Sequence, residues 1–412
     1  MAIVRPFKGL RPPKDVAAKL ASFPYDVINS DEARELAKGN PQSFLHINKP
    51  EIDLDPGINL YDQRVYDKAV ENFQMFQKKG WLVRDSETCY YIYKQVMNGR
   101  AQIGLMCCCS AQEYWDGKIK RHEFTRKDKE EDRLKHVDMT NCNAGPVFLT
   151  YPARDSINSM VDSVIKNPPE VDFTSEDGIQ HVLWVVKDAE WGKKITAEFA
   201  KIPALYVADG HHRTQAACRI AKVRAEKNPK HTGNEEYNFF MAVIFPHNHL
   251  LIMDYNRAVH DLNGLSDADF LKKVGEKFNV EKQNYKKPTA ANTFGMYLKG
   301  TWYKLTAKPG TYDSKDPVAS LDVSIMQNNL LAPILGIGDP RTDKRIDFIG
   351  GIRGVKELEK IVDSGKFVVA FAMFPTSIEQ LMKIADSGEV MPPKSTWFEP
   401  KLRSGMVIHT LD

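Results

Sequence analysis

The stretch ALYVADGHHRTQAACRIAK, residues 204–222, constrains the fold most because its hydrophobic pattern changes in the middle. Its first four residues are apolar and favour a β-strand. In its second half, small and apolar residues recur at spacings that fit one buried face of a helix. Asp209 and Gly210 stand at the change, where a sharp turn is expected. The sequence therefore predicts a strand that turns through glycine directly into a helix.

The residues around this turn have the chemistry of an anion site. Asp209, His211, His212 and Arg213 lie between the predicted strand and the body of the helix. A helix that starts after a glycine turn directs free backbone N–H groups and a positive dipole end outward. Arginine is the side chain best shaped to fork onto a phosphate. We therefore expect a phosphate site built on Gly210 and its neighbours.

The two adjacent histidines do not form a metal motif by their spacing. Neighbouring helical residues point about 100° apart, and zinc motifs place two or more residues between their ligands. We expect one histidine to face the ligand and the other to pack or to orient its neighbours. Two roles stay open for Asp209. It can form the turn or cap the helix, or it can hold a magnesium ion or a substrate hydroxyl group.

Helix and strand patterns alternate along most of the chain and predict a mixed α/β, or α+β, fold. Two β-favouring runs flank Asn98-Gly99, which predicts a hairpin, and a second hairpin is expected over residues 294–307. Helices are expected over residues 30–38 (capped by Ser30), 59–79, 125–138 (with Lys127 paired to Glu131), 156–165, 190–200, 356–362 and 377–385, and over 320–335, where Pro333 interrupts one. Further strands are expected over residues 146–151, 181–187, 237–245, 249–255 and 367–374.

The proline-rich N-terminal segment, residues 1–57, has little periodicity and is expected to wrap a core rather than form one. It is either a surface arm or a wall of the active cleft. The second interpretation rests on the polar residues that it brings into one region. These are Tyr25, Asp26, Asn40, His46 and Asn48.

Residues 117–145 are dense in charge and contain the phrase RHEFT. A solvated charged face is the usual explanation of such a segment. The alternative is that Glu123, beside His122 and several arginines, acts as a general base, with Thr125 close by.

The tail MPPKSTWFEPKLRSG, residues 391–405, is expected to be irregular, with its polar residues exposed. Lys394, Ser395 and Thr396 are good phosphate ligands but lack a glycine cradle before them. They are therefore either part of the phosphate site or a solvated tail. Lys401 and Arg403 are expected to be exposed as well.

Composition excludes some classes of protein. Lys plus Arg number 57 and Asp plus Glu 54, so the net charge of +3 does not favour a nucleic-acid-binding role. No secretory signal and no membrane-spanning run is seen, which predicts a cytoplasmic protein. The six cysteines form no C-x-x-C pair and are expected to be buried, reduced thiols. They are Cys89, Cys107, Cys108, Cys109, Cys142 and Cys218.

Several of these phrases together resemble one family. RPFKGLRP at the start, PYDVI at 24–28, RHEFT at 121–125, ADGHHR at 208–213 and the tail at 391–405 are similar to the domain-of-unknown-function family numbered 1015. More distantly, strand–DGHHR–helix resembles the site of the ParB/sulfiredoxin fold. The resemblance implies a core of that fold with N-terminal and C-terminal elaborations. We expect three parts, namely residues 1–116, residues 117–260 with the DGHHR site, and residues 261–412.

In that superfamily, free-serine kinases carry a D-G-H-x-R motif that receives nucleotide phosphates and an upstream glutamate that deprotonates serine. The resemblance implies ATP or ADP as donor, Mg²⁺ on Asp209, and free L-serine or a similar hydroxy compound as acceptor. It implies catalytic roles for Glu123, Asp209 and His211. Phosphate binding is assigned to Gly210, His212, Arg213, Lys394, Ser395 and Thr396, and substrate binding to His122, Thr125, Tyr25 and Asp26.

The alternative hypothesis is a nucleotide-binding regulatory module, similar to a ParB-type switch, with slow hydrolysis and no small-molecule acceptor. Sulfinic-acid reduction is not expected, because the DGHHR loop lacks the cysteine that sulfiredoxins need. The sequence leaves open whether the chain forms a homodimer.

Overall fold

The computed structural model describes residues 2–412, and the chain divides into two compact units. Unit 1 extends to Leu250 and resumes at Pro400, and unit 2 comprises Leu251–Glu399. The border between them lies near the boundary expected at residue 260. Residues on both sides of the boundary expected at residue 116 belong to unit 1, and residues 400–412 return to it. The three-part division itself stays a prediction.

Unit 1 is built on a mixed sheet, for which nine strands are found among the described residues. Its order is β6-β11-β8-β12-β5-β4-β10-β9, with β1 paired to β5. The strands are β1 (Val4–Arg5), β4 (Tyr90–Met97), β5 (Arg100–Ser110), β6 (Ile119–Lys120), β8 (Val147–Tyr151), β9 (Val171–Thr174), β10 (Gln180–Val186), β11 (Leu205–Asp209) and β12 (Phe239–Pro246). Short pairs join β2 (Leu10–Arg11) to β3 (Val83–Arg84) and β7 (Cys142–Asn143) to β21 (His409–Thr410).

The register at one end of this sheet positions the site. Strand β11 runs parallel to β6, with Leu205 opposite Ile119 and Tyr206 opposite Lys120. Because parallel strands end at the same edge of a sheet, the residues that follow β6 and β11 meet there. In the middle of the sheet, β4 and β5 form the hairpin expected at Asn98-Gly99, and both turn residues have positive φ.

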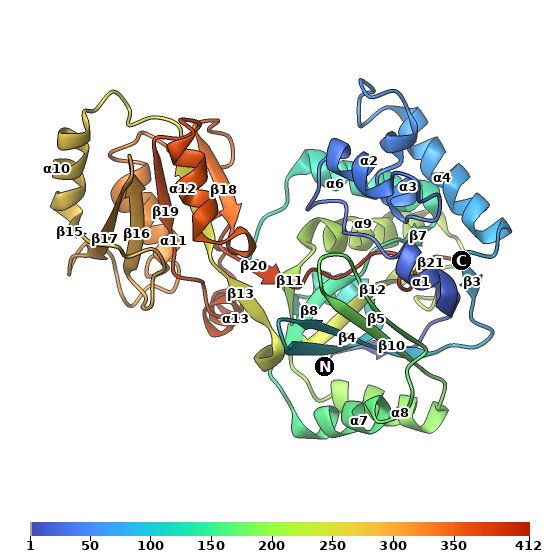
Figure 1. Ribbon diagram of the computed structural model, residues 1–412. Coiled ribbons are helices and arrows are strands. Elements are labelled where there is room, and N and C mark those ends of the chain that lie inside the picture. The colour runs from blue at the N-terminus through green and yellow to red at the C-terminus, as the bar shows by residue number, and fades with distance from the viewer. Residues whose placement is uncertain (1) are drawn as a thin grey trace. The chain divides into compact units, whose positions relative to one another are not determined.

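Helices α7 and α8 lie below the strands of unit 1 in Figure 1, and α2, α3, α4 and α6 lie above them. The helices are α1 (Lys14–Leu20), α2 (Ser30–Ala37), α3 (Leu45–Asn48), α4 (Gln63–Lys78), α5 (Ala111–Trp115), α6 (Lys127–Thr140), α7 (Asp155–Ile165), α8 (Ala189–Phe199) and α9 (His211–Lys227), with short 3₁₀ turns at Pro50–Asp53, Glu236–Asn238 and His247–His249.

Two details of these helices differ from expectation. The cap of α2 is Asn29 and not Ser30, because the Asn29 side chain accepts hydrogen bonds from the backbone of Asp31 and Glu32. On α6, Glu131 pairs with Arg219 at 2.7 Å rather than with Lys127, because α9 packs alongside and presents a guanidinium group.

The N-terminal segment contributes to a core of its own, contrary to the expectation that it only wraps one. Leu10, Leu20 and Phe44 are buried in one cluster with Phe73 and Phe76 of α4. A separate cluster lies on the sheet and includes Cys107, Cys109 and Cys218. All six cysteines are buried and free of disulfides, as expected.

Unit 2 contains an antiparallel sheet of order β15-β17-β16-β19-β14-β18. Its strands are β14 (Tyr255–Val259), β15 (Phe278–Lys282), β16 (Thr293–Leu298), β17 (Thr301–Ala307), β18 (Ile346–Gly350) and β19 (Val369–Ala372), and a ribbon pairs β13 (Leu251–Met253) with β20 (Trp397–Glu399). Its helices are α10 (Asp267–Lys277), α11 (Asp322–Met326), α12 (Val355–Asp363) and α13 (Ile378–Ser387), with a π-helical turn at Gln327–Leu331 and a 3₁₀ turn at Gly351–Arg353.

The hairpin expected over residues 294–307 is confirmed as β16 and β17. The strand expected over 249–255 is instead divided, because Asp254 leaves the ladder between β13 and β14 and its carbonyl accepts from the Gly351 amide. The mixed α/β class is confirmed. Within the described residues, no helix is both long and apolar enough to cross a membrane.

Candidate functional site

The turn from β11 into α9 has the predicted form. Gly210 is the N-cap residue of α9, with φ of 89°. A methyl group at this position would also lie 3.0 Å from the guanidinium carbon of Arg213. Two constraints therefore favour glycine, the left-handed backbone and the close approach of a side chain. No side chain caps α9, and its first turn carries no acidic residue, so its N-terminal N–H groups and dipole are available to an anion.

Asp209, the last residue of β11, lies between two cations. Its Oδ2 is 3.0 Å from Arg213, and its Oδ1 is 3.2 Å from Nζ of Lys401. Burial would raise the pKa of Asp209, but Lys401 and Arg213 outweigh it and hold that pKa well below its usual range. Asp209 is thus a permanent anion that fixes two cations. Each carboxylate oxygen of Asp209 already contacts a cation. The predicted role of Asp209 as a magnesium ligand stays a prediction.

The expectation that the tail exposes Lys401 and Arg403 is wrong. Lys401 is 8% exposed and Arg403 is 3% exposed. Arg403 pairs with Asp177 and stacks over the ring of Phe23, and the Lys401 carbonyl accepts a hydrogen bond from Gln95. Polarity suggested exposure, but carboxylate and amide partners from the sheet make burial of this segment favourable.

Arg213 also connects the turn to the N-terminal segment. It lies 3.6 Å from Asp26 and donates to the carbonyl of Pro146. Tyr25 stacks under the guanidinium group of Arg133, 3.9 Å from ring centre to Cζ. Burial raises the pKa of the Tyr25 hydroxyl, which therefore stays protonated. The structure thus brings Tyr25 and Asp26 to the DGHHR turn.

A narrow pocket of about 30 Å³ lies beside Arg213 and opens to solvent. Its polar lining includes Tyr25, Asn48, Arg133, Arg213 and Ser404. Two buried donors among them, Nδ2 of Asn48 and Nε of Arg213, have no hydrogen-bond partner. Buried polar groups are usually satisfied, so the pocket is suited to a ligand that carries acceptor oxygens.

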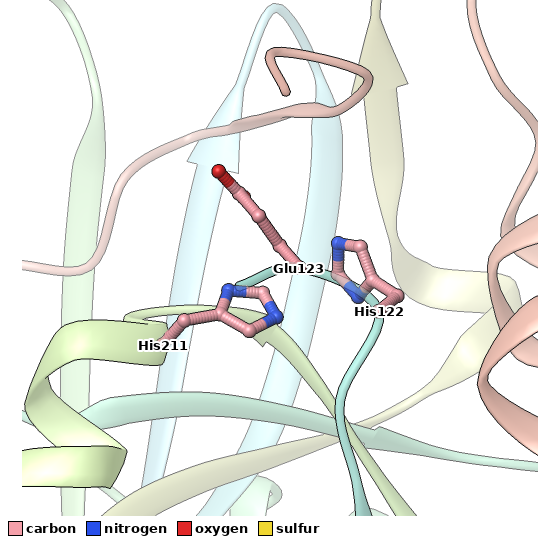
Figure 2. A group of neighbouring side chains, drawn as sticks. All are labelled: His122, Glu123 and His211. Carbon is pink, nitrogen blue, oxygen red and sulfur yellow. The ribbon is translucent and has the colours of Figure 1, made fainter. Parts of the chain in front are cut away.

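The second half of the site is the loop of residues 121–126 between β6 and α6. Figure 2 shows His122 and Glu123 of this loop beside His211, the first residue of α9. One ligand atom from each of the three residues lies within 4.8 Å of the others. The rings of His122 and His211 meet edge to face, with centroids 4.5 Å apart. The parallel pairing of β6 with β11 explains the meeting, because it brings the loop after one strand beside the turn after the other.

Both histidines of this cluster are buried. His122 is 1% exposed and His211 is 8% exposed. Burial lowers the pKa of His122 to about 4, although its ring hydrogen-bonds the backbone of Val207. Burial and the neighbouring His122 also lower the pKa of His211. Both rings are therefore neutral near pH 7, and neutral imidazole has a lone pair for a proton or a ligand.

Two further predicted residues hold this loop in the structure. Nε2 of His212 accepts a hydrogen bond from the Arg126 amide at 3.0 Å. The Thr125 hydroxyl donates to Glu130 at 3.0 Å. Their predicted roles toward phosphate and substrate stay predictions.

The remaining predicted phosphate ligands, Lys394, Ser395 and Thr396, belong to unit 2, whereas the DGHHR turn belongs to unit 1. Ser395 is buried, contrary to expectation, and its hydroxyl donates to the carbonyl of Pro392. The carbonyl of Lys394 accepts from Arg257. A role for these three residues at the phosphate site stays a prediction.

Sequence reasoning missed two residues of the site and identified a third only in part. Lys401 was placed in an exposed tail, Arg133 in a solvated charged helix, and Asn48 only in a general cleft wall. Periodicity could not identify these roles, because each depends on residues that lie far away in the sequence.

Comparison with known proteins gives a family and distant structural neighbours. Residues 4–324 match a family model described as "Protein of unknown function (DUF1015)", a range that ends before the tail motif. No curated protein matches the chain. Free serine kinase in complex with AMP is similar at 12% identity and a TM-score of 0.36, over 72% of this chain and 86% of that chain.

Two other solved structures are similar to the same degree. A conserved hypothetical protein from Pyrococcus furiosus has 13% identity and a TM-score of 0.36, over 73% of this chain and 93% of that chain. SbnI with a C-terminal truncation, from Staphylococcus aureus, has 11% identity and a TM-score of 0.39, over 73% and 85%.

Proposed function

Because the chain belongs to the DUF1015 family of proteins of unknown function, we propose its activity from its own site. The proposed reaction is transfer of a phosphoryl group from ATP or ADP to the hydroxyl group of a small acceptor, most specifically free L-serine. The observation that carries the proposal is the meeting of Glu123 with His211 of the DGHHR turn. This meeting brings a base candidate to the predicted phosphate site, and phosphoryl transfer depends mainly on such positioning and on charge neutralisation.

The donor phosphates are proposed to bind at the start of α9. The uncapped N–H groups, the helix dipole and Arg213 provide the attraction. Asp209 holds Arg213 and Lys401 in fixed positions, so little ordering is needed when a phosphate arrives. A magnesium ion that arrives on the nucleotide would neutralise further phosphate charge.

The acceptor is proposed to lie in the pocket beside Arg213. The unpartnered donors of Asn48 and Arg213 would receive the carboxylate of an amino acid, and Arg133 lies in the same lining. Asp26 provides a negative charge for an amino group. These features favour a small zwitterion such as serine over an uncharged alcohol.

In the reaction, Glu123 accepts the proton of the acceptor hydroxyl. The hydroxyl oxygen attacks the terminal phosphorus, and the bond from that phosphorus to the nucleotide oxygen breaks. Burial keeps His211 neutral, so it adds no positive charge that would weaken Glu123 as a base.

The test is the formation of O-phosphoserine from purified full-length protein, magnesium, L-serine and ATP or ADP, measured by mass spectrometry. Glu123→Gln should lower turnover by at least about 100-fold, in line with the loss of a general base. Asp128→Asn is the matched control, because Asp128 is an exposed carboxylate on the same segment that pairs with Arg126. No product with the wild type, or equal turnover in Glu123→Gln, would overturn the proposal. Slow nucleotide hydrolysis that serine does not stimulate would favour a regulatory module instead.

A further inference from the structure

We propose that His122, Glu123 and His211 form a binding site for a divalent transition-metal ion. These three side chains are brought together from a loop and a helix end that are distant in the sequence. Two imidazoles and one carboxylate are a donor set typical of zinc and of non-haem iron sites. His212, the neighbour of His211, is not a ligand, because its Nε2 accepts a hydrogen bond from the Arg126 amide.

The distances are compatible with one shared ion. Bonds of about 2.1 Å to a tetrahedral metal place the ligand atoms about 3.4 Å apart. In the structure these atoms lie within 4.8 Å of one another. Contraction of the longest separation by about 1.4 Å can come from movement of Glu123, which sits on a loop and is partly exposed.

An independent observation concerns His211. The residue is only 8% exposed, and its buried Nε2 atom has no hydrogen-bond partner. A buried unsatisfied polar atom is destabilising by about 1–3 kcal/mol. A bound metal ion would satisfy this nitrogen.

The surroundings of His122 also fit a metal ligand. Its ring hydrogen-bonds the backbone of Val207, the β11 residue two positions before Asp209. Such a bond from one ring nitrogen to a backbone carbonyl fixes the tautomer and directs the other nitrogen's lone pair toward the metal. The negative charge of Asp209 acts on both rings and would further favour a cation there.

The donor set also determines the type of metal. Magnesium and calcium prefer oxygen ligands, whereas imidazole suits zinc, cobalt, nickel and iron. Three protein ligands leave a coordination position open, as in catalytic rather than structural zinc sites.

The role of the metal rests on the proposed function, although its binding does not. At the open position the ion would bind the acceptor hydroxyl and lower its pKa. One oxygen of Glu123 would bind the ion, and the other would receive the hydroxyl proton. The acceptor oxygen would then form its bond to the phosphorus, with loss of the nucleotide leaving group.

The experiment uses full-length protein that has been treated with a chelator and then titrated with Co²⁺, Zn²⁺ or Mg²⁺, without nucleotide or serine. Co²⁺ binding is followed by visible absorption, and Zn²⁺ by competition with bound Co²⁺. One equivalent per chain is expected for Co²⁺ and Zn²⁺, and none for Mg²⁺. The Co²⁺ spectrum should lack intense thiolate charge-transfer bands, which separates this site from the buried cysteines.

Glu123→Gln and His211→Gln should each weaken Co²⁺ binding at least 100-fold, whereas His231→Gln should bind like the wild type. His231 is a matched control, because it pairs with Glu235 outside the cluster. Glu123→Gln changes one atom of a partly exposed side chain, so its folding, checked by circular dichroism, should be intact. Absence of Co²⁺ binding by the wild type, or equal binding by both cluster variants, would overturn the inference. An inactive protein that binds Co²⁺ would overturn only the kinase proposal, and an active one that binds none would overturn only the metal site.

Discussion

Nζ of Lys401 lies 3.2 Å from Oδ1 of Asp209, across 192 positions of the chain. This ion pair attaches the last segment of unit 1 to the DGHHR turn. Both side chains are largely removed from solvent, so loss of either one should lower the free energy of unfolding.

Lys401→Met should lower the free energy of unfolding of unit 1 by about 2–4 kcal/mol at pH 7, because Asp209 loses one of its two cations in a buried setting. The exposed Lys344→Met should have little effect. Chemical denaturation followed by circular dichroism measures both variants. In a double-mutant cycle with Asp209→Asn, a coupling energy close to zero would contradict this expectation.

The same pair predicts a pH dependence. The folded pKa of Asp209 is lowered, so its stabilisation is complete above the ordinary carboxyl pKa and is lost as pH falls through the lowered value. The stability difference between wild type and Lys401→Met should therefore shrink below about pH 4. A constant difference down to pH 2 would indicate that packing, and not charge, accounts for it.

Gly210→Ala should combine backbone strain with displacement of Arg213. The positive φ alone disfavours alanine by about 1 kcal/mol, and the added methyl group would press on the Arg213 guanidinium. Gly178→Ala is the control, because Gly178 has φ of 79° but open space around it. Gly210→Ala should be less stable than Gly178→Ala and should bind nucleotide at least 10-fold more weakly, measured by calorimetry. Equal stability and unchanged affinity would exclude the contact as a constraint.

Asn48→Leu should separate binding from stability. Its Nδ2 is buried without a partner, so loss of the amide should leave stability unchanged or raise it by about 1 kcal/mol. The KM for serine should rise about 10-fold, because the pocket loses a donor to the carboxylate. Loss of stability with unchanged KM would show that Asn48 is purely structural.

Asp322 of unit 2 should produce a separate pH effect. Burial raises its pKa to about 7, although the Asn292 amide donates to it. The folded state therefore holds the proton more tightly than the unfolded state, so stability falls as pH rises from about 4 to 7 and is level above that range. Asp322→Asn should remove this fall and be about 2–4 kcal/mol more stable at pH 8. The exposed Asp347→Asn should behave like the wild type, and a wild type of equal stability at pH 5 and 8 would contradict the shift.

Local chemistry was predictable from sequence. The hairpin at Asn98-Gly99, the turn at Gly210 and the helix at Gln63–Lys78 all follow from rules that involve only neighbouring residues. Turn residues and hydrophobic periodicity act over a few positions, so they are visible in one dimension. The strand–turn–helix unit that carries Asp209 and Arg213 belongs to this class.

Long-range pairing decided the rest of the site. No spacing in the sequence shows that β6 runs parallel to β11, yet that pairing is what brings Glu123 and His122 to His211. The polarity of the tail wrongly predicted exposed side chains, because their partners are also distant in the sequence. Lys401 and Arg403 are buried because Asp209 and Asp177 are there to receive them, and a charged side chain becomes stable in the interior only when its partner is present. The sequence by itself therefore determined the elements and the types of chemical groups, whereas the tertiary structure decided which of those groups meet.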